Sequence, residues 1–90
     1  MIKYTVNEQV VERGAHGICP ISLTDTLDTF TDFKRAEELF NDRKAQAPRK
    51  MDIYERGVHI TLEELHCDKD GEPLDFTIHA QYYGTWHDSE

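Results

Sequence analysis

The chain has 90 residues and a formal net charge of −8 at pH 7, with 38% hydrophobic and 31% charged residues. This length suits one small domain and excludes a large core. The negative charge repels nucleic acid and anionic membranes, and it attracts basic protein surfaces or cations. We therefore expect a protein partner with a basic surface, and neither direct nucleic-acid binding nor membrane binding.

The sequence carries no pattern typical of secretion or membrane insertion. Charges at Lys3, Glu8 and Glu12 are incompatible with a signal peptide, and no apolar run reaches the roughly 18 residues of a membrane span. Cys19 and Cys67 are too few for a disulfide framework. Their flanking residues favour reduced thiols, and a single bridge between them stays open. We expect a soluble cytoplasmic protein.

The N-terminal part predicts one strand followed by a turn and a less regular segment. From Ile2 to Val11, apolar residues at alternate positions share one face, and only Glu8 interrupts the row. A segment with two glycines then predicts a turn. Residues 18–23 could return as a short strand, which Pro20 would restrict to an edge of the sheet.

A single helix is predicted in the middle of the chain. Residues 24–32 alternate hydroxyl and carboxylate side chains, which suit helix caps better than a helix interior. The helix is expected from Asp32 to Gln46, and Pro48 prevents its continuation. Acidic and basic residues at its two ends suit the helix dipole. Four residues form its apolar stripe: Phe33, Ala36, Leu39 and Phe40.

Residues 57–83 predict a β-hairpin, because apolar and polar residues alternate on both sides of an Asp-Gly turn. Counting back from this turn places Leu62 opposite an outward residue, which is incompatible with one buried face. We therefore predict a β-bulge at Glu63 and Glu64, which would direct both carboxylates to the wet face or the edge. A longer loop near Pro73 is the alternative. The corrected register pairs Leu62 with Ile78, Ile60 with Ala80, and Val58 with Tyr82.

Together these elements predict one α+β domain over residues 1–83 and a polar tail over residues 84–90. The fold is an antiparallel sheet of three to four strands, in the order βαββ or ββαββ, packed on one helix. Five residues of the second hairpin strand are expected to face the core: Leu74, Phe76, Ile78, Ala80 and Tyr82. In the tail, Trp86 is expected to fold back on the sheet, with an exposed partner anchor as the alternative.

Six acidic residues near the hairpin turn form the predicted partner-binding site. They are Glu63, Glu64, Asp68, Asp70, Glu72 and Asp75, and the only base among them is Lys69. Carboxylates two residues apart on a strand recur at about 6.7 Å, so a strand edge can present a regular row of negative charge. Such a row could mimic nucleic-acid phosphates and compete for a basic groove.

No residue pattern predicts catalysis or a cofactor. Cys67 follows His66 directly, but neighbouring strand residues point to opposite faces and cannot form an activated thiol. His59 and His79 could supply two nitrogen ligands to zinc, which leaves a small metal-binding protein as an alternative function. We expect a protein that is not an enzyme and has neither cofactor nor metal.

The chain resembles in type the small acidic proteins that phages and mobile elements encode against bacterial defence, the anti-CRISPR and anti-restriction inhibitors. The resemblance rests on the length, the strand from Ile2 to Val11, the helical pattern from Phe33 to Phe40, and the acidic hairpin of residues 57–83. No diagnostic motif accompanies it, so no functional residue can be carried over.

The resemblance implies a stoichiometric inhibitor in the cytoplasm of a bacterial host. It would bind a CRISPR effector and block a DNA- or guide-binding surface, or lock the conformation of the effector. The alternative is a housekeeping protein-interaction adaptor with the same fold. The protein could be a monomer or a homodimer, because residues 18–23 or the first strand can leave an edge that pairs with a second copy.

Overall fold

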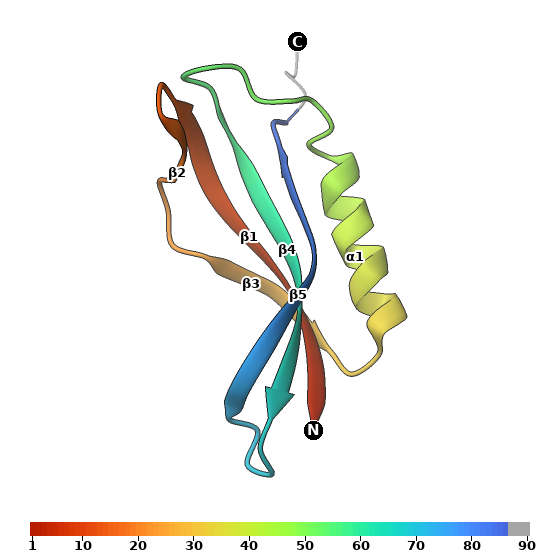
Figure 1. The fold of residues 1–90 in the computed structure, drawn as a ribbon. Coiled ribbons are helices and arrows are strands. Elements are labelled where there is room, and N and C mark those ends of the chain that lie inside the picture. Colours follow the sequence, from red (N-terminus) through yellow and green to blue (C-terminus); the bar gives the residue numbers. More distant parts are fainter. Residues whose placement is uncertain (87–90) are drawn as a thin grey trace.

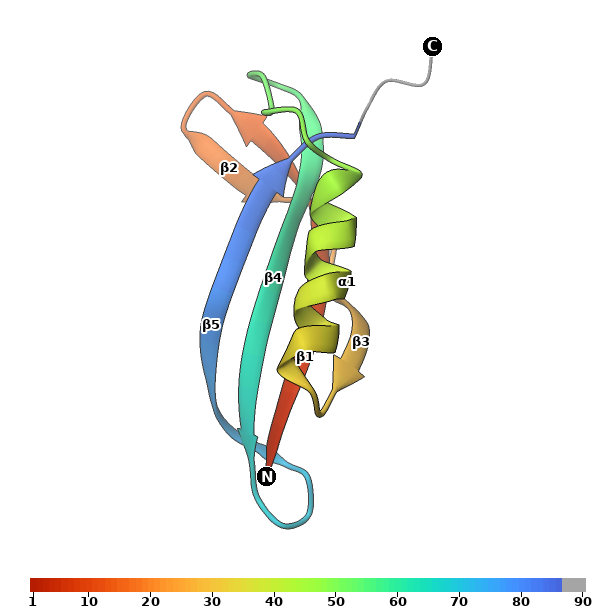
Figure 2. The same ribbon diagram turned by 90° about the vertical axis from the view of Figure 1, so that its right-hand side faces the viewer.

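A computed structural model describes residues 1–86, which form one antiparallel sheet with a single helix on one of its faces (Figures 1 and 2). The predicted α+β class is therefore confirmed, but the sheet has five strands in the chain order βββαββ. The elements are β1 (Ile2–Gly14), β2 (Gly17–Pro20), β3 (Asp25–Phe30), α1 (Phe33–Ala45), β4 (Arg56–Cys67) and β5 (Pro73–Gly84).

The strand β1 lies inside the sheet and extends beyond the predicted end at Val11. It pairs with β4 along most of its length, while β2 and β3 pair with successive parts of its other side. The sheet order is β2-β1-β4-β5, with β3 also beside β1. Because β1 has neighbouring strands on both sides, the expectation that it could leave an edge to pair with a second copy is wrong.

The segment expected to supply helix caps forms β3 instead, so that prediction is wrong for residues 25–30. Pairing with β1 outweighs the weak strand preference of its Asp and Thr residues. The predicted strand over residues 18–23 is correct only as far as Pro20, where β2 ends. Beyond Pro20, Ser22 still contacts β1 through its side chain and backbone. Its Oγ accepts a hydrogen bond from Val10 N at 3.0 Å, and its backbone oxygen accepts one from Gln9 Nε2 at 2.9 Å.

The helix α1 begins and ends where the sequence predicts. The side chain of Asp32 caps its N-terminus by accepting a hydrogen bond from Lys34 N at 3.1 Å, and Gln46 is the C-cap. Basic residues occupy the last turn, as the helix dipole favours. The apolar stripe of α1 packs on the middle of β1 and β4. The buried core consists of Val6, Ala36, Phe40, Ala47, Val58, Ile60 and Leu62.

The β4–β5 hairpin contains a bulge near the predicted position, but the extra residue lies on the other strand. Leu62 pairs with Ala80 and Glu63 pairs with Ile78, so His79 is the additional residue and belongs to β5. The predicted pairings of Leu62 with Ile78, Ile60 with Ala80, and Val58 with Tyr82 are therefore all wrong, since Ile60 pairs with Tyr82 and Val58 pairs with Gly84. An extra residue on either strand corrects the register between Leu62 and the turn. The sequence pattern does not show which of the two strands carries it.

This bulge changes which face the first half of β5 presents. Ala80 and Tyr82 pack against the core as predicted. The prediction is wrong for Leu74, Phe76 and Ile78, whose exposed fractions are 72%, 57% and 47%. A second register shift lies between His66 and Cys67, near the loop that was the alternative to the bulge.

The C-terminal end of the described chain remains attached to the fold. Gly84 ends β5, and Thr85 is buried and donates its hydroxyl to Arg56 O at 2.8 Å, so the first two residues of the predicted tail belong to the fold. Trp86 is 39% exposed. The remainder of the predicted tail, residues 87–90, lies outside the described residues.

Cys19 and Cys67 are both free, with Cys19 exposed and Cys67 buried. The thiols are therefore not bridged to each other, as their flanking residues suggested. Within residues 1–86, α1 is too short and too polar to cross a membrane.

Candidate functional site

The turn between β4 and β5 forms a tip that projects beyond α1, at the same end of the molecule as the N-terminus (Figure 1). The chain is elongated, with extents of 46 × 26 × 17 Å. The tip therefore lies away from the core between α1 and the sheet. All six acidic residues of the predicted site lie at this tip or on the strands that lead to it.

Asp68 holds the turn together instead of presenting its carboxylate outward. Its Oδ1 accepts hydrogen bonds from the backbone N–H groups of Asp70 and Glu72, both at 2.9 Å. Gly71 adopts a positive φ of 84°, which glycine reaches without strain. A turn lies at the predicted Asp70-Gly71 position, but it is longer than the predicted two-residue turn, because β4 ends at Cys67 and β5 begins at Pro73. Asp68 has a structural role in it.

Glu63 and Glu64 lie on opposite faces of β4, and both are hydrogen-bonded within the chain. Glu63 Oε2 accepts from Asn7 Nδ2 at 3.0 Å, on the face away from α1. On the helix face, Glu64 accepts hydrogen bonds from His79 Nε2 at 2.9 Å and from His66 Nε2. The expectation that a bulge directs both carboxylates to one wet surface is wrong, since adjacent strand residues alternate between faces.

The two histidines also change the acidity of Glu64. The hydrogen bond from His79, followed by that from His66, holds the pKa of this carboxyl below its ordinary value of 4.5. A hydrogen bond donated to a carboxylate favours its charged form, which explains the direction. Glu64 is thus tied to His66 and His79, and is not free to contact a partner.

The remaining three acids are exposed at the tip. Asp70 and Glu72 have no side-chain partner among residues 1–86, and Asp75 Oδ1 accepts only the backbone N–H of Phe76 at 2.8 Å. The exposed Lys69 lies on the same turn. We call Asp70, Glu72 and Asp75 the acidic tip. The six predicted residues therefore do not form one continuous row of charge.

Beside the acidic tip lies an exposed row of large apolar side chains, which we call the β5 apolar row: Leu74, Phe76 and Ile78. Within the described chain, β5 pairs with β4 on one side and has no strand on the other. Such an edge offers unpaired backbone N–H and C=O groups. Exposed apolar side chains beside a free edge are typical of a surface that binds another chain.

The face of the sheet away from α1 carries buried polar side chains, which the sequence pattern did not predict. Thr5, Asn7 and Thr61 are buried there. Asn7 donates to Glu63, as described above, and its Oδ1 accepts from the hydroxyl of Thr26 on β3 at 2.9 Å. Buried polar side chains in the described part of the chain all have hydrogen-bond partners. This network is therefore explained by its role in joining β1, β3 and β4.

His59 and His79, the alternative zinc ligands, do not come together. His59 stacks on Tyr83, with ring centroids 4.1 Å apart, on the face away from α1. His79 instead contacts the ring of Phe33, the first residue of α1, with the two ring centroids 5.2 Å apart. Among residues 1–86, no group of three or more His, Cys, Asp or Glu side chains could hold a metal ion.

Comparison with known proteins gives no match: no family model fits the chain, and no curated protein or solved structure is significantly similar to it. The candidate site is therefore defined only by the surface features of this chain. Its most distinctive part is the combination of the acidic tip with the β5 apolar row. The sequence indicated the acids, but it placed the apolar residues in the core.

Proposed function

We propose that the protein is a small inhibitor that binds a basic surface of a protein partner through the acidic tip and the β5 apolar row. The partner we propose is a CRISPR effector, whose nucleic-acid-binding or nuclease activity is blocked in the complex. The observation that carries this proposal is the exposure of three large apolar side chains on a strand that, within the described chain, has a neighbour on one side only, next to the turn that carries the exposed Asp70 and Glu72.

The two parts of this surface would contribute different terms to binding. Exposed carboxylates attract a basic partner and raise the association rate, but they contribute little once they are solvated at a rim. Buried aromatic and aliphatic anchors contribute most of the affinity. Phe76 is the largest side chain in the apolar row, and we propose it as the main anchor.

The arrangement of charge favours docking of a strand edge over imitation of a phosphate backbone. Glu63, Glu64 and Asp68 are occupied by hydrogen bonds within the chain. Of the six predicted site residues, the exposed ones are therefore concentrated at one end of β5. A partner that pairs with this strand would gain backbone hydrogen bonds along the edge and contacts with alternate side chains.

The proposal is tested by measuring target-DNA cleavage by a panel of purified RNA-guided nucleases, with the protein in molar excess. We expect cleavage by at least one nuclease to be blocked. A variant with Asp70→Lys, Glu72→Lys and Asp75→Lys is expected to associate about tenfold or more slowly at low salt, and the difference should shrink at high salt.

A matched control places the same charge change on α1. Glu37, Glu38 and Asp42 are exposed there, and their replacement by lysine alters the net charge equally. We expect this control to bind almost as fast as the parent at physiological salt. Equal slowing in both variants would show that net charge, and not the acidic tip, drives association.

Three further results would contradict the proposal. Phe76→Ser should weaken binding by about tenfold or more, because it removes the side chain that would be buried as an anchor in the complex. Unchanged affinity would show that the β5 apolar row does not contact the partner. Undiminished cleavage by every nuclease in the panel would reject the inhibitor role. Binding to a nuclease without loss of cleavage would favour the adaptor instead.

A further inference from the structure

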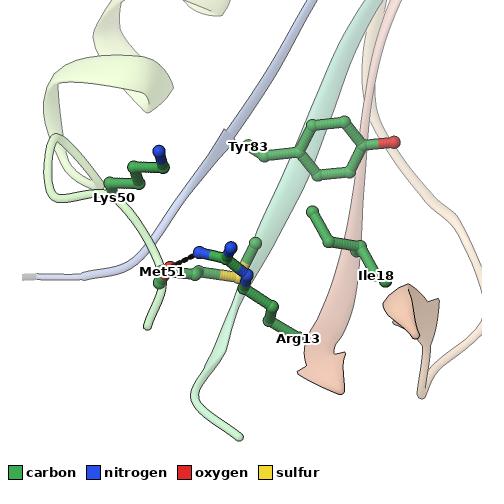
Figure 3. Close-up of a pocket in the computed structure, with 6 residues that line it drawn as sticks. Arg13, Ile18, Lys50, Met51 and Tyr83 are labelled. Atoms are coloured by element: carbon green, nitrogen blue, oxygen red, sulfur yellow. Dashed lines mark hydrogen bonds between the residues drawn. The ribbon is translucent and has the colours of Figure 1, made fainter. Parts of the chain in front are cut away.

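A second feature lies at the end of the sheet opposite the acidic tip (Figure 1). Here a cavity opens between the β1–β2 hairpin, the loop before β4, and β5 (Figure 3). Its volume is about 520 Å³, within the range of small-molecule sites. Six residues line it: Arg13, Gly17, Ile18, Lys50, Met51 and Tyr83. None of them belongs to the surface proposed above.

Three apolar or aromatic side chains form its walls, and two of these are held in place. Met51 is 3% exposed and packs over Gly57, where an added Cβ would collide with the Met51 side chain. The ring of Tyr83 is stacked parallel to that of His59, with an interplanar angle of 7°. Ile18 completes the walls from β2 and is 41% exposed. The cavity is therefore shaped before any ligand enters.

The charged side chains that line the cavity, Arg13 and Lys50, are both cationic, in a chain whose net charge is −8. Arg13 Nη1 donates a hydrogen bond to Met51 O at 2.8 Å, which orients the guanidinium (Figure 3). Within residues 1–86 this is the only hydrogen bond of the Arg13 side chain, so most of its five N–H donors have no protein acceptor. Lys50 is exposed at the rim and has no ion-pair partner within the same residues.

The two acids of the loop before β4 are paired with a different cation, Arg49. Glu55 accepts a hydrogen bond from Arg49 Nη2 at 2.6 Å, and Asp52 also forms an ion pair with Arg49, with 3.7 Å between nitrogen and oxygen. Arg13 and Lys50 thus remain as positive charge beside apolar walls. An oriented guanidinium matches the planar geometry of a carboxylate, to which it can donate two parallel hydrogen bonds.

We propose that this cavity binds a small organic carboxylate with an aromatic or aliphatic body. The carboxylate would accept hydrogen bonds from Arg13, Lys50 would add attraction at the rim, and the body would pack among Ile18, Met51 and Tyr83. A cationic ligand is disfavoured by the two positive charges. An anion without an apolar body would leave the walls hydrated and would gain little from them.

The test is a titration of the whole ¹⁵N-labelled protein with benzoate, followed by NMR. We expect benzoate to shift the amide signals of Ile18, Met51 and Tyr83. Benzamide, which has the same body without the charge, should bind about tenfold or more weakly. Acetate and inorganic phosphate, which have charge without the body, should also bind more weakly than benzoate.

Two variants and a matched control complete the test. Arg13→Gln should weaken benzoate binding about tenfold, because it removes a charge-assisted hydrogen bond. Lys50→Gln should weaken it by about threefold or less, and this exposed position does not endanger folding. Lys34→Gln on α1 removes the same charge far from the cavity, and we expect no change.

Three results would overturn the carboxylate site. They are equal binding of benzamide and benzoate, equal effects of Lys34→Gln and Arg13→Gln, and benzoate-induced shifts confined to residues outside the cavity. Phosphate binding tighter than benzoate binding would reject the ligand class, because the apolar walls would then have no role.

Discussion

Glu8 and Arg43 form a two-pronged ion pair that joins β1 to the last turn of α1. Arg43 Nε donates to Glu8 Oε2 at 2.8 Å, and Arg43 Nη2 donates to Glu8 Oε1 at 2.9 Å. The side chain of Glu8 is 13% exposed and that of Arg43 is 31% exposed. Glu8 is the one residue that interrupts the apolar row in the sequence of this strand. The helix supplies the partner that makes a carboxylate acceptable on the core side of the sheet.

Removing Arg43 is expected to destabilise the fold. Arg43→Ala leaves the mostly buried carboxylate of Glu8 without its two donors, which should lower the free energy of unfolding by about 1–3 kcal/mol. Urea denaturation measures this change. Arg35→Ala is the control, because Arg35 is exposed on the same helix and should change stability by less than about 0.5 kcal/mol. Equal effects of the two substitutions would show that the ion pair contributes nothing.

Close backbone contacts make Gly84 sensitive to substitution. A Cβ at this position would collide with Ala47 O, at the point where the chain leaves α1 and where Tyr82 Oη donates to the same oxygen at 2.6 Å. We expect Gly84→Ala to lower the free energy of unfolding by about 1–3 kcal/mol. At Gly14 the nearest atom would be 3.7 Å away, so Gly14→Ala should be tolerated. Thermal unfolding of both variants tests the contrast.

The hydrogen bonds of Glu64 predict a specific dependence of stability on acid pH. Its pKa lies below 4.5 in the folded state because His79, then His66, donates to the carboxylate. The unfolded state therefore binds more protons near this pH. The resulting stabilisation is present above pH 4.5 and is lost as pH falls through the lower pKa of the folded state.

Glu64→Gln should therefore flatten the pH dependence of the unfolding free energy below about pH 4.5. Glu55, whose pKa is also lowered, chiefly by the hydrogen bond from Arg49, contributes in the same direction. The double variant with Glu55→Gln should be flatter than either single variant. Chemical denaturation at several pH values measures the slopes, and an unchanged slope in Glu64→Gln would contradict the assignment.

The sequence predicts those parts of the fold whose patterns are local. The helix is predicted to within one residue because its cap Asp32 and its apolar spacing lie within the same segment. The strand β3 is missed because nothing in its composition indicates pairing with a strand about 20 residues earlier. The site is predicted in part for the same reason. The sequence shows where acids cluster, but only the cross-strand contacts show that Glu63 and Glu64 are already occupied.

The hairpin register is the largest difference between the prediction and the structure, and one pair of substitutions tests it. Ile60 is 1% exposed and Ile78 is 47% exposed, although the sequence pattern places both in the core. With the extra residue at His79, Ile60→Ala should lower the free energy of unfolding by about 2–5 kcal/mol. Ile78→Ala should lower it by less than about 1 kcal/mol, because its side chain is half exposed. Urea denaturation of both variants decides between the registers. Similar large losses would place Ile78 in the core and move the bulge to β4, and the whole β5 apolar row, which shares one face of the strand, would then face the core.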